Sequence, residues 1–316
     1  MSEQKLIAVV GATGAQGGGL VRAIAAHPDG GFTARAITRD PASDKAKSLA
    51  ELGAEVVQAD LDDRASVERA FAGAYGAFCV TNFWEHFSPD KEIAQAENMA
   101  EAAKSAGVQH VIWSTLEDTR KWVPLDDDRM PTLNERWKVP HYDGKGVADA
   151  VFTSRGLPVT LLLTSFYWEN LIYFGMGPQR GDDGSLSITF PIGEGRIAGM
   201  AAGDIGKAAY GIFAAGDAYI GKTVGIAGEF LSGAEMAAQL SDALGQPVGF
   251  NSVPPEVYRS FGFPGAEDIG NMFQFTTEFE SEYCAARDLD ETRRLNPEAK
   301  DFRAWLAENK EQIPVP

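Results

Sequence analysis

Short apolar runs and longer amphipathic segments alternate through the first half of the chain. Compact apolar runs predict strands, and apolar residues at helical spacing predict helices. The expected strands are Lys5–Val10, Phe32–Thr38, Glu55–Gln58, Gly76–Val80, Gln109–Ser114 and Pro158–Thr164. The expected helices are Gly18–Ala26, Ser43–Leu52, Arg64–Phe71, Pro89–Ala106 and Lys145–Arg155. This alternation predicts an α/β protein with a doubly wound parallel sheet covered by helices on both faces, which is a Rossmann fold.

The pattern changes twice along the chain. Residues 116–140 show no clear period, and a connection of this length is typical of a functional lid or a disordered excursion. Beyond Tyr173, glycine and proline become frequent and the apolar segments are short. Strands are expected near Ser187–Pro191, Thr223–Ala227 and Val248–Val253, and helices near 204–215 and 232–243. The sequence therefore predicts a Rossmann domain over residues 1–165 and a smaller C-terminal α/β lobe, residues 166–316, that does not fold independently.

Composition limits the classes of partner. Hydrophobic residues make up 44% and charged residues 23% of the 316 residues, as in ordinary globular proteins. The formal net charge of −17 disfavours direct binding to nucleic acid, because the phosphate backbone would meet a repulsive field. No apolar run approaches the ~20 residues of a membrane span, and no secretion signal is recognisable. With two cysteines, Cys79 and Cys284, the chain fits a reducing compartment. We therefore expect a cytoplasmic protein that does not bind membranes.

Two further patterns favour structural interpretations. Cys79 lies in the apolar run Ala77–Val80, which predicts a small buried strand residue rather than a reactive thiol. The run Asp126–Asp128 has no histidine or further carboxylate cluster nearby in sequence. It therefore predicts a solvated face rather than a metal site, and we expect no bound metal.

A glycine-rich loop follows the first expected strand and leads into the first expected helix. It reads Gly11-Ala12-Thr13-Gly14-Ala15-Gln16-Gly17. In such a loop the first glycine permits a tight turn, the second lets the backbone approach a pyrophosphate, and the third lets the helix pack close to the sheet. Amide groups at the helix start then favour phosphate. A purely structural turn does not account for three consecutive glycines, Gly17–Gly19, at a helix start, so the loop predicts a dinucleotide-binding site.

The residues after the second expected strand bear on the choice of dinucleotide. A site for NAD usually has an acidic side chain here, which binds the ribose 2′-hydroxyl. Arg39 instead offers a guanidinium fork suited to a 2′-phosphate, and Lys45 follows at the next helix start. Asp40 leaves two alternatives open, because its carboxylate could face the ribose or pair with Arg39. We favour NADP(H) over NAD(H) as the cofactor.

Seven segments, spread in order over nearly the whole chain, resemble one protein family. They are Val9–Gly18, Thr38–Pro41, Gly53–Asp60, Val80–Glu85, His141–Gly146, Tyr167–Leu171 and Gly262–Ala266. Together they resemble the NmrA-like family, atypical members of the short-chain dehydrogenase/reductase superfamily. The resemblance is greatest to the NmrA-like proteins described as NADPH sensors, and it implies a Rossmann fold that binds a nicotinamide dinucleotide.

The resemblance also assigns cofactor contacts to matching residues of this sequence. It implies that Gly11 through Gln16 cradle the pyrophosphate and that Arg39 binds the 2′-phosphate. It implies that Asp60 and Leu61 flank the adenine. The residues implied at the riboses are Thr81, Asn82, Phe83 and Lys145. Those implied at the nicotinamide end are Tyr167, Trp168, Glu169 and Asn170. Family members can carry a lysine near the position of Ala94. Here the nearest lysine is Lys91, which puts that extra basic contact in question.

Some of these residues also have structural interpretations. Lys145 is expected as the first residue of a helix, where the dipole favours anions, so we favour a role against cofactor hydroxyls over a solvated lysine. Asp143 is interpreted as the N-cap of that helix. Tyr167 and Trp168 either line the nicotinamide end or belong to the core under the C-terminal lobe.

The chain lacks the Tyr-x-x-x-Lys pair that typical short-chain dehydrogenases use to exchange a proton with the substrate. Tyr142 is followed four residues later by Gly146, and the other tyrosines also lack a lysine at that spacing. Two functions stay open. In the first, which we favour, the protein is a redox sensor whose cofactor changes a surface for a regulatory protein partner or a homodimer. In the second, Lys145 is the catalytic residue of an NADPH-dependent reductase acting on a small apolar carbonyl, enone or quinone.

Overall fold

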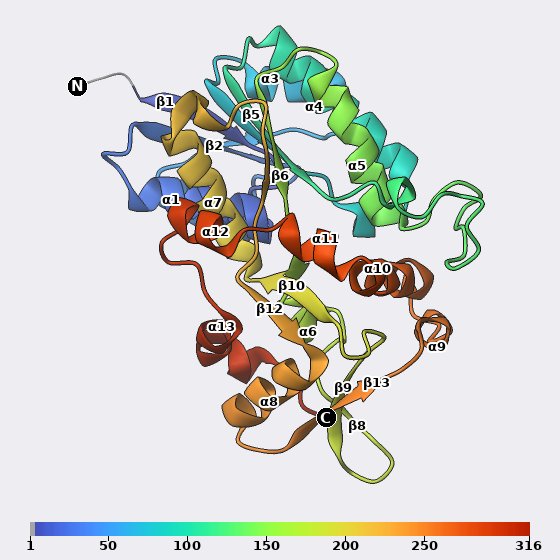
Figure 1. Cartoon of the computed structure of the whole chain (residues 1–316). Coiled ribbons are helices and arrows are strands. Elements are labelled where there is room, and N and C mark those ends of the chain that lie inside the picture. The colour runs from blue at the N-terminus through green and yellow to red at the C-terminus, as the bar shows by residue number, and fades with distance from the viewer. Residues whose placement is uncertain (1–3) are drawn as a thin grey trace.

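A seven-stranded sheet forms the centre of the computed structural model, which describes residues 4–316 (Figure 1). Its strands are β1 (Lys5–Val9), β2 (Phe32–Thr38), β3 (Glu55–Gln58), β4 (Gly76–Cys79), β5 (His110–Thr115), β6 (Val159–Leu163) and β11 (Thr223–Gly225). The spatial order is β11-β6-β5-β4-β1-β2-β3, and each neighbouring pair is parallel. The strand order reverses between β1 and β4, where α/β sheets bind ligands beyond the carboxyl ends of the strands. The predicted fold class is confirmed.

Helices cover both faces of this sheet. The first face carries α1 (Ala15–Ala26), α2 (Asp44–Glu51) and α7 (Ala202–Ala214). Leu20, Leu49 and Ile212 on these helices share one apolar core with Val9 of the sheet. The opposite face carries α3 (Arg64–Phe71), α4 (Pro89–Ser105) and α5 (Pro140–Thr153), which share a second core with the sheet. Cys79 is buried in this second core, and burial raises the pKa of its thiol, so its structural interpretation holds.

The C-terminal lobe combines two small sheets with helices. One sheet contains β12 (Glu229–Ser232), β10 (Arg196–Met200) and β7 (Phe166–Tyr167), and the other β13 (Val248–Ser252), β9 (Leu186–Phe190) and β8 (Gln179–Arg180). The remaining α-helices are α6 (Asn170–Tyr173), α8 (Gly233–Leu244), α9 (Pro255–Arg259), α10 (Ala266–Glu278), α11 (Glu280–Ala285), α12 (Leu289–Leu295) and α13 (Phe302–Asn309). Short 3₁₀ helices are η1 (Phe83–Glu85), η2 (Thr119–Lys121), η3 (Gly216–Tyr219) and η4 (Lys310–Gln312). A third core, which includes Trp168, Phe273 and Trp305, holds the lobe together.

Parts of the chain beyond residue 166 return to the Rossmann sheet. β11 pairs with β6, with Thr223 beside Leu161. α7 packs so closely on α1 that a Cβ on Gly19 would lie 2.3 Å from the carbonyl oxygen of Gly203. The strand expected at Thr223–Ala227 therefore belongs to the central sheet rather than to the lobe.

The connection over residues 116–140 packs against α10. Met130 is buried in the core of the lobe. The Lys138 side chain is also buried, and its Nζ donates to the carbonyl oxygens of Asp127 and Met130, both at 2.7 Å. Asn271 on α10 donates to the carbonyl oxygen of Lys138 at 2.5 Å. Because these contacts fix the backbone, the alternative of a disordered excursion is wrong.

Residues 4–316 contain neither a membrane-spanning helix nor a cluster of metal-ligating side chains. None of their helices has the length and hydropathy needed to cross a bilayer. These residues also contain no group of three or more metal-ligating side chains. In the acidic run, Asp126 and Asp128 are exposed, and the Asp127 carboxylate accepts a hydrogen bond from Arg129 Nε at 2.8 Å.

Candidate functional site

The glycine-rich loop joins the carboxyl end of β1 to α1. Gly11 has a φ of +63°, a left-handed conformation that glycine adopts without a Cβ penalty. α1 begins at Ala15, three residues before the predicted Gly18, because Gly14 already takes the extended N-cap conformation. No side chain caps this helix, whereas side chains cap the starts of α2, α3 and α4. The uncapped amides of the first turn can donate hydrogen bonds to a pyrophosphate, so the loop fits the dinucleotide that its sequence predicts.

Packing alone accounts for the run of glycines at the start of α1. A Cβ on Gly17 would lie 2.6 Å from the carbonyl oxygen of Gly11, so glycine lets the helix begin directly behind the turn. A Cβ on Gly18 would lie 2.9 Å from the carbonyl oxygen of Ala12, and Gly19 faces α7. The argument from the entropy cost of these three glycines therefore does not by itself support a ligand.

Gln16 connects the loop to two other parts of the site. Its Nε2 donates to the Tyr167 hydroxyl at 2.5 Å, and its Oε1 accepts from Ser114 Oγ at 2.8 Å. Ser114 lies on β5 and Tyr167 on β7, so this side chain ties the loop to both the sheet and the lobe. Burial raises the pKa of Tyr167 to about 12, which keeps its phenol protonated at neutral pH.

Arg39 follows the end of β2, and 64% of its side chain is exposed. Its Nη1 forms an ion pair with Glu85 Oε1, and this contact raises the pKa of the guanidinium. Asp40 does not pair with Arg39, which contacts Glu85, and its alternative role at the ribose stays a prediction. Its Oδ1 instead accepts from the amide of Ala42 at 2.9 Å, which closes the turn before α2.

Acidic residues surround Arg39 on the β3 side. Asp60 and Leu61 follow β3, and the Asp60 carboxylate accepts from the amide of Asp62 at 2.9 Å. Asp60 and Asp62 both add to the negative potential at Arg39. Lys91 on α4 pairs with Asp62 Oδ2 at 2.8 Å, so this lysine offsets one of those charges. The local field around Arg39 is therefore set by acids as well as bases.

Lys145 has a nearly buried side chain, 12% exposed, whose ammonium is fixed by two residues. Nζ donates to Thr81 Oγ1 at 2.7 Å and to the Thr81 carbonyl oxygen at 3.2 Å, and it lies 2.9 Å from Glu92 Oε1. Thr81 Oγ1 donates to the same Glu92 oxygen at 2.6 Å. The other carboxylate oxygen, Glu92 Oε2, is buried without a hydrogen-bond partner in the described chain. Glu92 thus supplies a buried counter-charge that holds the ammonium at the end of β4.

The other three residues predicted at the riboses differ in their surroundings. Thr81 is buried and bound to Lys145 and Glu92. Asn82 is exposed after the end of β4. Phe83 is buried at the start of η1, and its ring centroid lies 5.9 Å from that of His141.

α5 begins at Pro140, five residues before the predicted start. Proline is favoured at a first helical position, so Pro140 starts the helix and does not end the connection before it. Lys145 therefore lies in the second turn, and the argument from a helix N-terminus is wrong for it. Asp143 is the fourth residue of α5 rather than its N-cap. Its buried carboxylate accepts from the amides of Thr119 and Lys138, both at 2.8 Å, and so fixes the preceding connection.

The residues after Tyr167 turn toward the core of the lobe. Trp168 is 1% exposed and packs against Trp305, so the core alternative holds for it. Glu169 accepts from Trp305 Nε1 at 3.1 Å and from a backbone amide of α7 at 2.9 Å, and burial raises its pKa. Asn170 is half-buried and begins α6. Trp168 and Glu169 therefore anchor the strand that carries Tyr167 to the core of the lobe and to α7.

The tyrosines near the site do not supply a phenol to Lys145. The Tyr142 hydroxyl lies 3.4 Å from the Tyr283 hydroxyl, and burial raises the pKa of Tyr142 well above its usual value. The Tyr167 hydroxyl faces Gln16. The arrangement agrees with the missing Tyr-x-x-x-Lys pair, because a phenol must contact the lysine for its pKa to be lowered.

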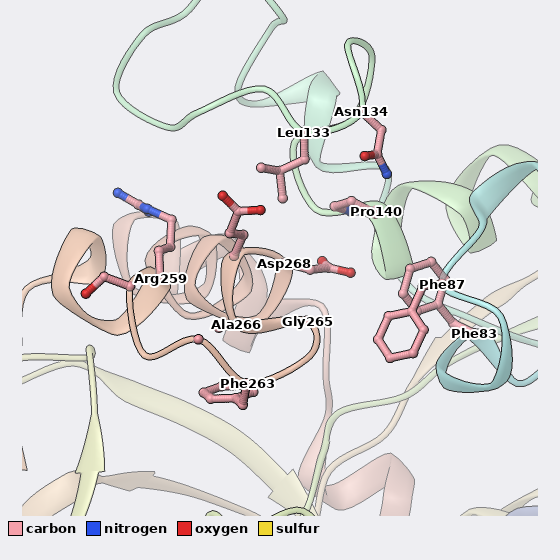
Figure 2. A pocket seen from close by; sticks show the side chains of 13 residues that line it. Phe83, Phe87, Leu133, Asn134, Pro140, Arg259, Phe263, Gly265, Ala266 and Asp268 are labelled. Atoms are coloured by element: carbon pink, nitrogen blue, oxygen red, sulfur yellow. The ribbon is translucent and has the colours of Figure 1, made fainter.

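A cavity of about 350 Å³ lies between the β4–α4 connection and the turn that joins α9 to α10 (Figure 2). Its lining residues are Phe83, Phe87, Leu133, Asn134, Pro140, Arg259, Ser260, Gly262, Phe263, Gly265, Ala266, Glu267 and Asp268. In Figure 2 the rings of Phe83 and Phe87 form one wall, while the Arg259 guanidinium points away from the cavity. Asp268 pairs with His141 Nδ1 at 2.7 Å. This volume can hold a small molecule against aromatic walls.

Sequence reasoning missed three residues that organise the site: Glu85, Glu92 and Ser114. Glu92 carried a signal, since it shares a helical spacing with buried Ala96 and Met99 and a carboxylate on an apolar stripe needs a partner. Glu85 and Ser114 carried none, because their partners lie 46 and 98 residues away in the chain.

Comparison with known proteins identifies the family. The model of the NmrA-like family matches residues 3–306. This chain belongs to the NmrA-like family. This NmrA-like protein is 29% identical to the NmrA-like family domain-containing oxidoreductase FrzB of Cladobotryum sp, over 89% of this chain and 86% of that protein. It is also 29% identical to the oxidoreductase ptmS of Penicillium ochrochloron, over 96% and 97% of the two chains.

Solved structures of NmrA, described as a negative transcriptional regulator, are also similar. One has a TM-score of 0.79 and 27% identity, with 96% of this chain and 95% of that chain covered. NmrA in complex with NAD has a TM-score of 0.79, and NmrA in complex with NADP has 0.78, each at 25% identity with 97% and 95% coverage. Relatives of this NmrA-like protein therefore include both named oxidoreductases and a regulator.

Proposed function

We propose that this NmrA-like protein binds NADP(H) and acts as a redox-responsive regulatory binder, whose cofactor changes a surface offered to a protein partner. The observation that carries the proposal is the Lys145 ammonium, which Thr81 and Glu92 hold without a phenol beside it. A fixed cation of this kind suits the hydroxyls of a bound ribose better than proton exchange with a substrate. The regulator NmrA, solved with NADP, is consistent with this role.

The residues of the site provide complementary donors for this cofactor. The uncapped amides at the start of α1 suit the pyrophosphate. Arg39 suits the 2′-phosphate, and the exposed Lys45 at the start of α2 adds a second positive charge on the same side. Asn82 and Lys145 would bind the nicotinamide ribose. A phosphate at Arg39 has to displace Glu85, and this requirement sets the size of the effects expected below.

We expect Arg39→Gln to weaken NADP⁺ binding by about 10- to 100-fold, because a hydrogen bond to a charged group contributes roughly 1.5–3 kcal/mol. NAD⁺ binding should change by less than about threefold, since its 2′-hydroxyl carries no charge. Isothermal titration calorimetry with both dinucleotides measures the two effects. The matched control for the loss of one positive charge is Arg69→Gln on α3, where the arginine side chain is 72% exposed. An equal loss of both dinucleotides would refute the assignment of Arg39.

A reductase is the second candidate. The cavity lined by Phe83, Phe87 and Phe263 lies beside the site and suits a flat apolar substrate. Two relatives at 29% identity are named as oxidoreductases. In this case the bound dinucleotide supplies a hydride, and Lys145 donates a proton to the substrate oxygen or stabilises the negative charge that develops there.

The Lys145→Met variant separates the two functions. If the protein is a reductase, NADPH oxidation with a panel of quinones and enones should fall by about 100-fold or more in kcat, the usual contribution of a general acid. If it is a binder, the wild type should bind NADPH tightly and turn over no acceptor. Turnover that Lys145→Met abolishes contradicts the binder proposal. The Lys145→Met/Glu92→Gln double variant is the control for folding, because it also removes the carboxylate that the single change leaves buried.

A further inference from the structure

An exposed ion pair joins the ends of two neighbouring parts of the site. Arg39 follows β2, and Glu85 ends η1 in the connection between β4 and α4. Their side chains are 64% and 45% exposed. An exposed pair adds little stability and exchanges readily for a stronger partner. A phosphate is such a partner, because it carries up to two negative charges and can accept both prongs of a guanidinium.

The backbone of Arg39 is tied to β3, whereas that of Glu85 is held by a turn bond within its own segment. Gln58 Nε2 donates to the carbonyl oxygen of Arg39 at 3.0 Å. The amide of Glu85 donates to the carbonyl oxygen of Asn82 at 3.3 Å. Arg39 therefore stays at the end of β2 when the pair opens, and any wider movement falls on the η1 side.

We propose that Glu85 determines cofactor specificity by competing with the 2′-phosphate of NADP(H) for Arg39. The inference rests on the proposed NADP(H) site and assigns to Glu85 an effect that weakens the binding of NADP(H) at that site. Glu85 occupies Nη1, one of the donors that the phosphate needs, and its carboxylate repels a second anion. The uncharged 2′-hydroxyl of NAD(H) meets neither effect. Glu85 thus narrows the preference for NADP(H) that Arg39 alone would give.

The same residue connects the 2′-phosphate to the cavity. Glu85 lies on the segment Phe83–Phe87, and the two phenylalanines at its ends line the cavity of about 350 Å³ (Figure 2). Phe87 has a φ of +53°, a strained conformation for an aromatic residue. Trp84 packs between Phe87 and His141, with ring centroids 5.8 and 4.9 Å apart. A phosphate that displaces Glu85 removes one tether of this strained segment, whereas NAD(H) leaves the tether intact.

Calorimetric titration of the full chain with NADP⁺ and NAD⁺ tests the competition. Glu85→Gln should tighten NADP⁺ binding by about three- to tenfold, as expected when an exposed ion pair and one repulsive charge are removed. NAD⁺ affinity should stay within about twofold. The gain should disappear in the Arg39→Gln background, since Glu85 acts through Arg39. Glu68→Gln is the matched control, because Glu68 also pairs with an arginine, at 2.8 Å, but on α3.

The outcomes separate this inference from the proposed function. If Glu85→Gln leaves NADP⁺ affinity unchanged or weakens it, while Arg39→Gln still loses NADP⁺, the competition is wrong and the NADP(H) site stands. Equal tightening of both dinucleotides also overturns the competition, because it shows only a general loss of negative charge. If the wild type binds neither dinucleotide, the proposed function fails as well.

Emission from Trp84 tests the connection to the cavity wall. The signal is obtained as the difference between the wild type and Trp84→Phe. NADP⁺ should shift it and NAD⁺ should not, and Glu85→Gln should show the shifted signal before cofactor is added. A signal that both dinucleotides change equally, or that neither changes, would overturn this part of the inference.

Discussion

Replacing Arg287 with alanine is expected to lower the free energy of unfolding by about 3–5 kcal/mol. The guanidinium is fully buried after α11, and its Nη1 and Nη2 donate to the two carboxylate oxygens of Glu117 at 2.7 and 3.1 Å. It also donates to the carbonyl oxygens of Thr164, at 2.6 and 2.9 Å, and of Tyr283, at 2.9 Å. Its removal leaves a buried carboxylate without a counter-charge and two buried carbonyl groups without donors. Urea unfolding measures the loss.

Two variants control this experiment. Arg293→Ala removes an arginine side chain of α12 that is 58% exposed. This change should lower the free energy of unfolding by less than about 1 kcal/mol. The Arg287→Met/Glu117→Leu double variant replaces both charges with apolar groups and should recover much of the stability. A loss below about 1 kcal/mol for Arg287→Ala would show that water enters and replaces the guanidinium.

Asp149 should make the stability of the protein depend on pH in the opposite sense to a typical surface carboxylate. Burial raises its pKa to about 7, although Thr115 Oγ1 donates to Oδ1 at 2.6 Å and Lys121 favours the charged form. The unfolded pKa is about 3.9. The folded state therefore binds the proton more tightly, and its stability falls as pH rises from about 4 to about 7. Above pH 7 the charged carboxylate costs roughly 2–4 kcal/mol relative to a neutral group.

The Asp149→Asn variant isolates this effect. Asparagine keeps an oxygen for Thr115 but does not ionise. The stability of the variant relative to the wild type should increase by roughly 2–3 kcal/mol between pH 5 and pH 8, because part of the wild-type loss has already occurred at pH 5. Chemical unfolding of both proteins at pH 5, 6.5 and 8 gives the difference, in which the contributions of other carboxylates cancel. A difference that does not change with pH would show that Asp149 titrates normally in the folded protein.

The local pattern predicted most of the Rossmann elements because each depends on nearby residues. β2, β3 and α3 have the predicted bounds, and α2 is one residue shorter at each end than predicted. The local pattern did not predict the place or the bounds of an element where contacts with residues far away in the chain determine them. Thr223 is in the central sheet because it pairs beside Leu161, and α5 extends back to Pro140 because Asp143 accepts the amides that precede it.

The predicted site also contains residues that the sequence indicated and residues that only the tertiary structure brings to it. Glycine spacing, strand ends and side-chain charge predicted the glycine loop and Arg39 as candidates, and the family resemblance added Lys145. Their partners were not visible. Glu85 reaches Arg39 across 46 residues, and Glu92 reaches Lys145 from another helix. Trp168 illustrates the reverse case, because only its packing on Trp305 removes it from the cofactor side.

The sequence by itself determined a doubly wound parallel sheet and a loop at its crevice that fits a pyrophosphate. Periodicity and glycine spacing are local properties of the chain, so they can be recognised without knowledge of the fold. Tertiary structure alone decided what each charge faces: Glu85 on Arg39, Glu92 on Lys145, Glu117 on Arg287. The physical reason is that an ion pair or a buried carboxylate depends on distance in space. The number of residues between two positions in the sequence does not determine that distance.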